Sequence, residues 1–269
     1  MDDKKSISTT KWAVLNLIFY FSTLAINYLG SSGFFNGMGQ KDISDKYTTL
    51  ITPATFAFSI WGVIYGLLLI TLIYFFIKRK DPRASKVVEL ISPLFILSSV
   101  FNIGWIVTFS YELLGISTIL IFAMLFSLII IIEKIYKNRA EISYILPILS
   151  FTLYSAWVFI ASVINVALFL VQKNWGGLGI SNSIWTIIVL FIAIAFVLFY
   201  LSQYKNAIFP ISVAWGFFGI YKSYTNGKLS PPMSSTIEIV LLGGIVIFII
   251  SIIATFVRNG NSILPSKKT

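Results

Sequence analysis

Aromatic and amide side chains recur at helical spacing inside runs that are otherwise apolar. In the stretch 153–165, LYSAWVFIASVIN, the residues Tyr154, Trp157, Ala161 and Asn165 fall on one face of a helix. Indole and phenol rings stack on flat molecules, while amide and hydroxyl groups donate and accept hydrogen bonds. The chemistry that this pattern indicates is therefore recognition of a ligand rather than the making or breaking of bonds.

Two further stripes of the same kind precede this one. Asn102, Trp105 and Phe109 are spaced to share one helix face, and Trp61 and Tyr65 share another. Three helices thus each present an aromatic ring beside an amide, a hydroxyl or a small residue. An aromatic-walled pocket with a few hydrogen-bonding groups suits a flat, largely apolar ligand.

The same residue types also have structural uses in membranes. Asparagine and serine form hydrogen bonds between membrane helices, and tryptophan and tyrosine anchor helix ends at the interface. Trp12, Trp175 and Trp185 lie near the ends of apolar runs, so we interpret these three as interfacial anchors. For each residue of the stripes, a purely structural role stays open.

The residue types that several kinds of catalysis and metal binding require are absent from this sequence. The 269 residues contain no cysteine and no histidine, which excludes disulfides, thiolate or imidazole metal ligands, a histidine base and a His or Cys haem ligand. The charged residues, 11% of the chain, lie at the ends of apolar runs or between them. Proton relays and ion-coupled transporters usually need an ionisable group near the membrane centre. We therefore predict no catalytic residue and no metal site, and favour a binding protein over an enzyme.

The stripes must be positioned by membrane-spanning helices. The chain is 57% hydrophobic, and a helix of about 20 apolar residues crosses the hydrocarbon layer. We predict an all-α polytopic membrane protein with eight spans, near residues 12–30, 55–77, 88–110, 113–135, 142–172, 182–203, 206–222 and 235–257. The seventh is short and contains Pro210, Gly216 and Gly219, so a re-entrant or kinked segment is its alternative.

Basic residues indicate the orientation of the spans. Only five of the 20 lysines and arginines fall in the connectors of one side, so the other side, with both termini, is predicted to be cytoplasmic. The net charge of +10 then reflects topology and contact with anionic lipid headgroups rather than nucleic-acid binding. We expect a multi-pass protein of the cell membrane whose first span is not a cleaved signal.

The connector from Ser31 to Pro53 is the longest in the predicted topology. It contains three glycines and the mixed-charge stretch KDISDK, and it is predicted to lie outside the cell. A lid over a binding site and a solvated connector are both consistent with such a sequence. A second connector, Ser223 to Ser235, carries Pro231 and Pro232 just before the last span, where prolines make a good helix start.

Three motifs resemble those of a known family. YSAWVFIASVIN, residues 154–165, fits the family pattern YLAWVSFATVLN at seven of twelve positions. Asn102, Trp105 and Phe109 reproduce a spacing N-x-x-W-x-x-x-F, and PATFAFSIWGVIY, residues 53–65, is similar to PPGWVFGPVWTLLY but one residue shorter. In this order the motifs resemble the TspO/MBR family of tryptophan-rich sensory proteins and translocator proteins.

The resemblance covers about residues 10–175 and implies a five-helix core. We therefore expect a TspO-like domain over 1–175 and a three-helix extension over 176–269. Family members bind tetrapyrroles such as protoporphyrin, and some bind sterols or synthetic drugs, so the expected partners are membrane lipid and a small hydrophobic ligand. A bound porphyrin is compatible with the resemblance, no cofactor is required, and a homodimer stays open.

This sequence departs from the family pattern at several positions. The tryptophan after the paired prolines is Phe56, the second proline is Ala54, and Leu153 replaces the proline before Tyr154. Phe169 is the only aromatic residue in the stretch before Lys173 where the family's sterol pattern needs a tyrosine. We therefore predict neither sterol binding nor porphyrin turnover.

The leading hypothesis is a sensory or regulatory membrane protein that binds a flat apolar or porphyrin-like molecule. Trp61, Trp105 and Trp157 would supply stacking walls, and Ala161 would leave room. The hydrogen-bonding groups would come from Tyr65, Tyr154, Asn102 and Asn165, with Phe56 and Phe109 completing the apolar lining. A transporter of a small neutral or amphipathic solute and an assembly partner of another membrane protein are the alternatives.

Overall fold

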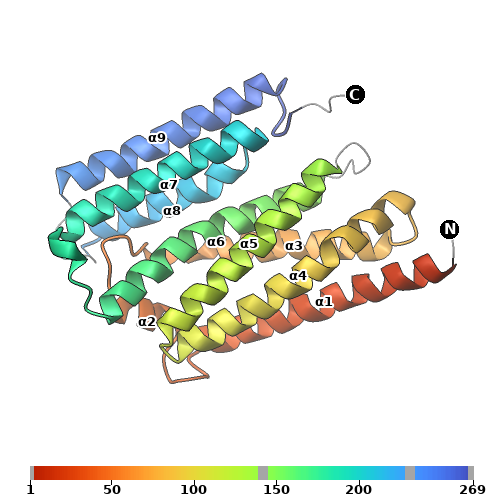
Figure 1. Ribbon diagram of the computed structural model, residues 1–269, viewed down its shortest axis with the longest axis horizontal. Helices are drawn as coiled ribbons and strands as arrows, with labels where there is room; N and C mark the ends of the chain where they lie inside the picture. The colour runs from red at the N-terminus through yellow and green to blue at the C-terminus, as the bar shows by residue number, and fades with distance from the viewer. Residues whose placement is uncertain (1–2, 139–144, 228–233, 266–269) are drawn as a thin grey trace. The chain divides into compact units, whose positions relative to one another are not determined.

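The computed structural model describes residues 3–138, 145–227 and 234–265, and within them every regular element is a helix (Figure 1). The long helices are α1 (Asp3–Ser31), α3 (Ile60–Ile77), α4 (Pro82–Ser110), α5 (Leu114–Lys137), α6 (Ile145–Gln172), α7 (Asn182–Tyr204), α8 (Phe209–Thr225) and α9 (Ser235–Arg258). Three short ones complete the set: α2 (Gln40–Lys46) and the 3₁₀ helices η1 (Thr55–Ser59) and η2 (Gly177–Gly179).

Each of the eight apolar runs of the sequence forms a helix. Of the predicted fifth span, 142–172, the first three residues lie outside the described residues, and α6 covers the rest. Seven helices of the described chain are long and apolar enough to cross a membrane. The eighth, α8, has 17 residues and a length of about 26 Å at 1.5 Å per residue, somewhat less than the roughly 30 Å of hydrocarbon. It is one uninterrupted helix despite Pro210, which lies in its first turn.

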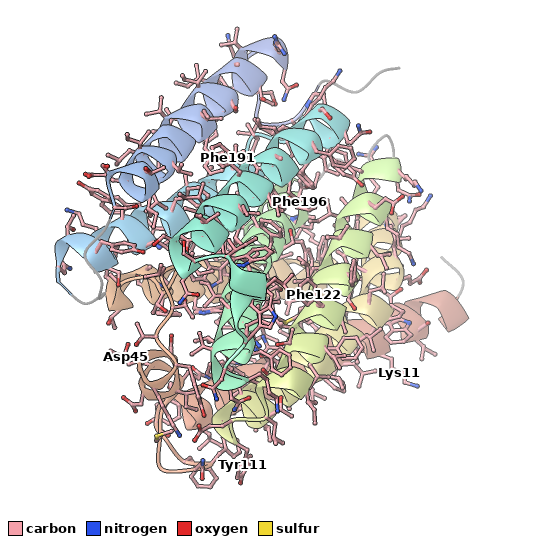
Figure 2. All side chains as sticks on the ribbon, turned by 60° about the vertical axis from the view of Figure 1, so that its left-hand side comes forward. Lys11, Asp45, Tyr111, Phe122, Phe191 and Phe196 are labelled. Atoms are coloured by element: carbon pink, nitrogen blue, oxygen red, sulfur yellow. The ribbon has the colours of Figure 1, made fainter. Side chains whose placement is uncertain are left out.

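Large apolar side chains point away from the helices. Phe191 of α7 is 56% exposed and Ile119 of α5 is 70% exposed. Figure 2 shows such side chains standing out along the helices, with Phe191 among them. In water this surface would be costly, whereas acyl chains solvate it at no cost. The exposed apolar surface therefore agrees with the hydropathy of the helices.

The chain divides into two compact units. The first contains residues 1–43 and 61–158, and so α1, α3, α4, α5 and the first half of α6. The second contains residues 44–60 and 159–268, and so η1, the second half of α6, and α7 to α9. We describe each unit separately.

In the first unit, α1 and α4 lie side by side and run in the same direction (Figure 1). Polar pairs connect them at three levels. The Thr9 hydroxyl donates to a carboxylate oxygen of Glu89 at 2.8 Å, and Asn16 Nδ2 donates to Ser92 Oγ at 2.8 Å. The third pair includes Asn102, described below. Such pairs fix the register of two helices in a membrane, where apolar packing alone specifies it weakly.

The second unit is built around α8 and α9. Two glycines allow close packing there: a Cβ on Gly216 would lie 3.1 Å from Ile160, and one on Gly244 would lie 2.8 Å from Phe217. Ser234 is the N-cap of α9, since its side chain accepts from Ile237 N at 3.3 Å. The expected start signal Pro231–Pro232 lies outside the described residues.

The long connector before α3 is packed rather than fully solvated. Ile43, Thr49 and Thr52 are all buried. The Thr49 and Thr52 hydroxyls lie 3.0 Å apart, and Thr52 Oγ1 also accepts from Thr49 N at 3.0 Å. This turn therefore satisfies much of its own hydrogen bonding, which keeps an irregular segment ordered.

Candidate functional site

Five aromatic rings meet in the first unit. They come from α3 (Trp61, Tyr65), α4 (Trp105) and α6 (Tyr154, Trp157), and we call them the aromatic cluster. Trp61 is central: it stacks on Tyr65 with ring centroids 5.3 Å apart and lies 6.2 Å from Trp105. It meets Tyr154 and Trp157 edge-on at 6.0 and 6.3 Å. Spacings of four residues on α3 and three on α6 place each pair on one helix face.

A single buried amide connects the cluster to its surroundings. Asn102 is fully buried, and its Nδ2 donates to the Tyr154 hydroxyl at 3.0 Å and, more weakly, to the Tyr65 hydroxyl at 3.4 Å. Its Oδ1 accepts from Asn27 Nδ2 at 2.7 Å. One side chain on α4 thereby joins α1, α3 and α6. These hydrogen bonds offset the cost of removing an asparagine from water, because both amide hydrogens and the amide oxygen have partners.

The outer partners of this network were not predicted. Tyr154 donates its hydroxyl to Met124 Sδ of α5 at 3.4 Å, and Tyr20 of α1 donates to the Tyr65 carbonyl at 2.8 Å. Asn27 could have been found as an amide inside an apolar run. Its pairing with Asn102 depends on the register of α1 against α4, which one sequence does not reveal.

The cluster has a buried side and a more open side. Tyr154 and Trp157 are 2% and 1% exposed, whereas Trp61, Tyr65 and Trp105 are half-buried. Phe109, one turn after Trp105 on α4, lies 6.2 Å from it and is buried. Since the rings contact one another, a flat molecule would stack on the accessible rings or separate them, and the amide and phenol groups would offer hydrogen bonds.

The other predicted site residues belong to the second unit. Phe56 lies edge-on to Trp215 at 5.4 Å and to Phe218 at 5.8 Å, both on α8. Asn165 is 2% exposed and Ala161 is half-buried on the second half of α6. Their part in binding a ligand stays a prediction.

The segment that carries Phe56 is fixed to α8. Ala54 N donates to the Gly219 carbonyl at 2.9 Å, and Trp215 Nε1 donates to the Ala57 carbonyl at 2.9 Å. A Cβ on Gly219 would lie 2.6 Å from the Ala57 Cβ, so only glycine permits this approach. Neither Trp215 nor Gly219 was predicted to contact the residues before α3.

Comparison with known families identifies the chain. It matches the family described as TSPO-like protein over residues 13–254, which is most of its length. The matched range continues past residue 175 and includes most of α7 to α9, which the three motifs do not reach. No curated protein and no solved structure matches it. With its apolar helices and this match, the chain is a multi-pass membrane protein that belongs to the TSPO-like protein family.

Proposed function

We propose that this protein is a membrane sensor that binds a flat, largely apolar molecule of the porphyrin type at the aromatic cluster. The observation that supports this most is the convergence of five rings from three helices around the buried Asn102 amide. Such a site combines stacking surfaces with a few fixed polar groups, as ligand pockets commonly do.

The half-buried rings are the contact surface in this proposal. Trp61 and Trp105 stack on the ligand, while the buried Trp157 supports them from behind. Tyr65, Tyr154 and Asn102 offer hydrogen bonds to polar substituents on the ligand edge.

The contacts of Asn102 suggest how binding would be sensed. The other four rings each lie within 6.3 Å of Trp61, so a ligand that inserts among them must turn at least one ring aside. Tyr154 and Tyr65 cannot move far without changing their hydrogen bonds to Asn102. Because Asn102 also holds Asn27 of α1, insertion would alter contacts on several helices at once.

The membrane arrangement that goes with this function is also a proposal. The positive-inside distribution supports cytoplasmic termini and therefore α8 as an eighth span. We further propose that the protein lies in the cell membrane and that residues 1–175 form a TspO-like core followed by a three-helix extension.

Protoporphyrin IX tests the proposed site directly. The purified full chain in detergent is titrated with protoporphyrin IX, and binding is followed by the absorbance and emission of the porphyrin itself. In a variant with Trp61→Leu and Trp105→Leu, two stacking faces are lost, and the affinity should fall by about tenfold or more.

Trp12→Leu is the control, because Trp12 is a half-buried tryptophan of α1 outside the aromatic cluster. It should bind like the unmodified protein. Equal affinity in the folded double variant, checked by circular dichroism and gel filtration, would refute the site. Absence of binding by the unmodified protein would refute a porphyrin as the ligand.

A further inference from the structure

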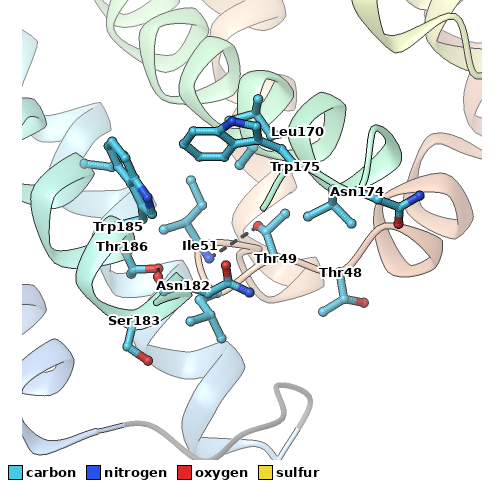
Figure 3. Close-up of a pocket in the computed structure, with 14 residues that line it drawn as sticks. Thr48, Thr49, Ile51, Leu170, Asn174, Trp175, Asn182, Ser183, Trp185 and Thr186 are labelled. Carbon is cyan, nitrogen blue, oxygen red and sulfur yellow. Dashed lines mark hydrogen bonds between the residues drawn. The ribbon is translucent and has the colours of Figure 1, made fainter. Parts of the chain in front are cut away.

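A cavity of about 650 Å³ lies within the second unit, apart from the residues of the aromatic cluster. Three segments line it: the turn Thr48–Ile51, the last turns of α6 with the residues after it, and the first turns of α7 (Figure 3). Its volume is within the range of small-molecule sites, roughly 300–1,000 Å³. None of the predicted site residues lines it.

One side of the cavity is an apolar wall. The indoles of Trp175 and Trp185 contact each other with ring centroids 5.2 Å apart and 53° between their planes. Trp185 Nε1 donates to the Gly177 carbonyl at 2.8 Å, which fixes that ring. Ala167 and Leu170 of α6 continue the wall. The two tryptophans are thus more than generic membrane anchors, since they form one surface of a hollow.

The turn Thr48–Ile51 forms a preorganised side. Ile51 N donates to Thr49 Oγ1 at 3.3 Å, drawn as a dashed line in Figure 3, and Thr49 is tied to Thr52 as described above. Tyr224 of α8 donates its hydroxyl to the Leu50 carbonyl at 2.8 Å, which anchors the turn to a long helix. Binding here would therefore cost little ordering of the protein backbone.

The polar groups of the cavity are all uncharged. Among the fourteen described residues that line it, none is Asp, Glu, Lys or Arg. Asn174 and Asn182 are exposed residues and Ser183 is half-buried, and all three line the cavity. Figure 3 shows Thr48, Asn182 and Ser183 below the two indoles, with Ser183 on the same helix as Trp185. An ionic headgroup would find no counter-charge among these residues, whereas a neutral hydroxylated head could use the amide and hydroxyl groups.

We propose that this cavity binds a neutral amphipathic molecule with a hydroxylated head and an apolar body. The head bonds to Asn174, Asn182 and Ser183, and the apolar body packs on the wall of Trp175, Trp185, Ala167 and Leu170. The site lies where α6 ends and α7 begins, at the level at which two candidate spans meet water. It is independent of the porphyrin proposal, because the two sites share no residue.

A photoreactive monolauroylglycerol, with a diazirine at the end of its acyl chain, tests the proposal on the full chain in nanodiscs. After illumination, mass spectrometry should locate the label on peptides from the cavity segments. Unlabelled monolauroylglycerol should compete, whereas lauroyl lysophosphatidylglycerol, which is anionic, and glycerol, which has no apolar body, should compete at least about tenfold more weakly.

Two alanine-to-phenylalanine variants provide a matched pair. Ala167→Phe fills part of the cavity and should reduce labelling about tenfold. Ala195→Phe places the same side chain on an exposed position of α7 that does not line the cavity, and labelling should stay unchanged. Asn182→Ala with Ser183→Ala, a milder change that removes two of the proposed partners of the head, should weaken competition by monolauroylglycerol severalfold.

Three results would overturn the proposal. Equal competition by the neutral and the anionic lipid would indicate annular lipid rather than a specific site. Label found outside the cavity segments, or undiminished labelling of a folded Ala167→Phe variant, would also contradict it. Porphyrin affinity, measured in the same variants, should not change. This readout separates a failure of the cavity proposal from a failure of the aromatic-cluster proposal.

Discussion

At the scale of single residues, Asn102 has the most consequential contacts in the first unit. Its amide bonds to side chains of three other helices while it is fully buried. Removal of a buried amide costs each of its partners one hydrogen bond in a setting where water does not replace it. Asn102 therefore serves stability and, in our proposal, ligand sensing.

Asn102→Leu should lower the free energy of unfolding by about 1–3 kcal/mol, because Asn27 and Tyr154 lose a buried partner. Thermal or SDS unfolding in detergent, followed by circular dichroism, measures the loss. Tyr65→Phe is the comparison: its bond to Asn102 is 3.4 Å long, so the loss should stay below about 1 kcal/mol. A larger loss of stability for Tyr65→Phe than for Asn102→Leu would show that Asn102 is not the centre of the network.

Residue spacing alone predicted much of the candidate site's geometry. Trp61, Trp105 and Trp157 were assigned to inward faces from helical periodicity, and the structure brings Trp61 into contact with both of the others. Periodicity identifies which face a residue occupies, but the height at which two helices pair is decided by long-range packing. For that reason Asn27 and Met124 were not found.

At the scale of elements, α8 shows why glycines in an apolar run are ambiguous. Gly216 and Gly219 suggested a kinked or re-entrant segment, whereas both are positions of close packing, against Ile160 and against Ala57. A sequence shows that a side chain is missing, and only the neighbouring segment shows what occupies the space. Here the neighbour of Gly219 is about 160 residues earlier in the chain.

Gly219→Ala should destabilise the protein by about 1–3 kcal/mol, since the new methyl group would lie 2.6 Å from the Ala57 Cβ. Gly243→Ala in α9 is the matched control, because its Cβ meets no atom within 4 Å. The control should be neutral or up to about 1 kcal/mol more stable. The same unfolding assay measures both, and equal behaviour of the two variants would contradict the close approach of residues 53–57 to α8.

At the scale of the whole molecule, hydropathy predicted the helices almost completely. The eight apolar runs and the observed helices agree within a few residues at most ends, because twenty apolar residues in a row have few other stable conformations in lipid. The division into two units and the cavity in the second were not predicted. Both depend on which turns pack against which helices, and the turn Thr48–Ile51 carries no motif that indicates its neighbours.

The membrane topology can be tested in intact cells because the chain contains no cysteine. A single cysteine at Gly176 or Asn226 should react with a membrane-impermeant maleimide from outside. A cysteine at Lys80 or Gln203 should react only after the membrane is permeabilised. All four positions are exposed. Protection of Asn226→Cys together with labelling of Gly176→Cys would show that α8 does not span.

The position of the Trp175–Trp185 cavity at the ends of two candidate spans affects how binding there would be measured. An amphipath would reach it from the leaflet, where partitioning has already concentrated the molecule. Each added methylene strengthens partitioning by about 0.8 kcal/mol, close to fourfold. Affinities expressed per aqueous concentration would therefore rise with chain length even if no new protein contact formed. Affinities expressed as a mole fraction of lipid would stop rising once the acyl chain became longer than the cavity. The chain length at that plateau would report the depth of the cavity.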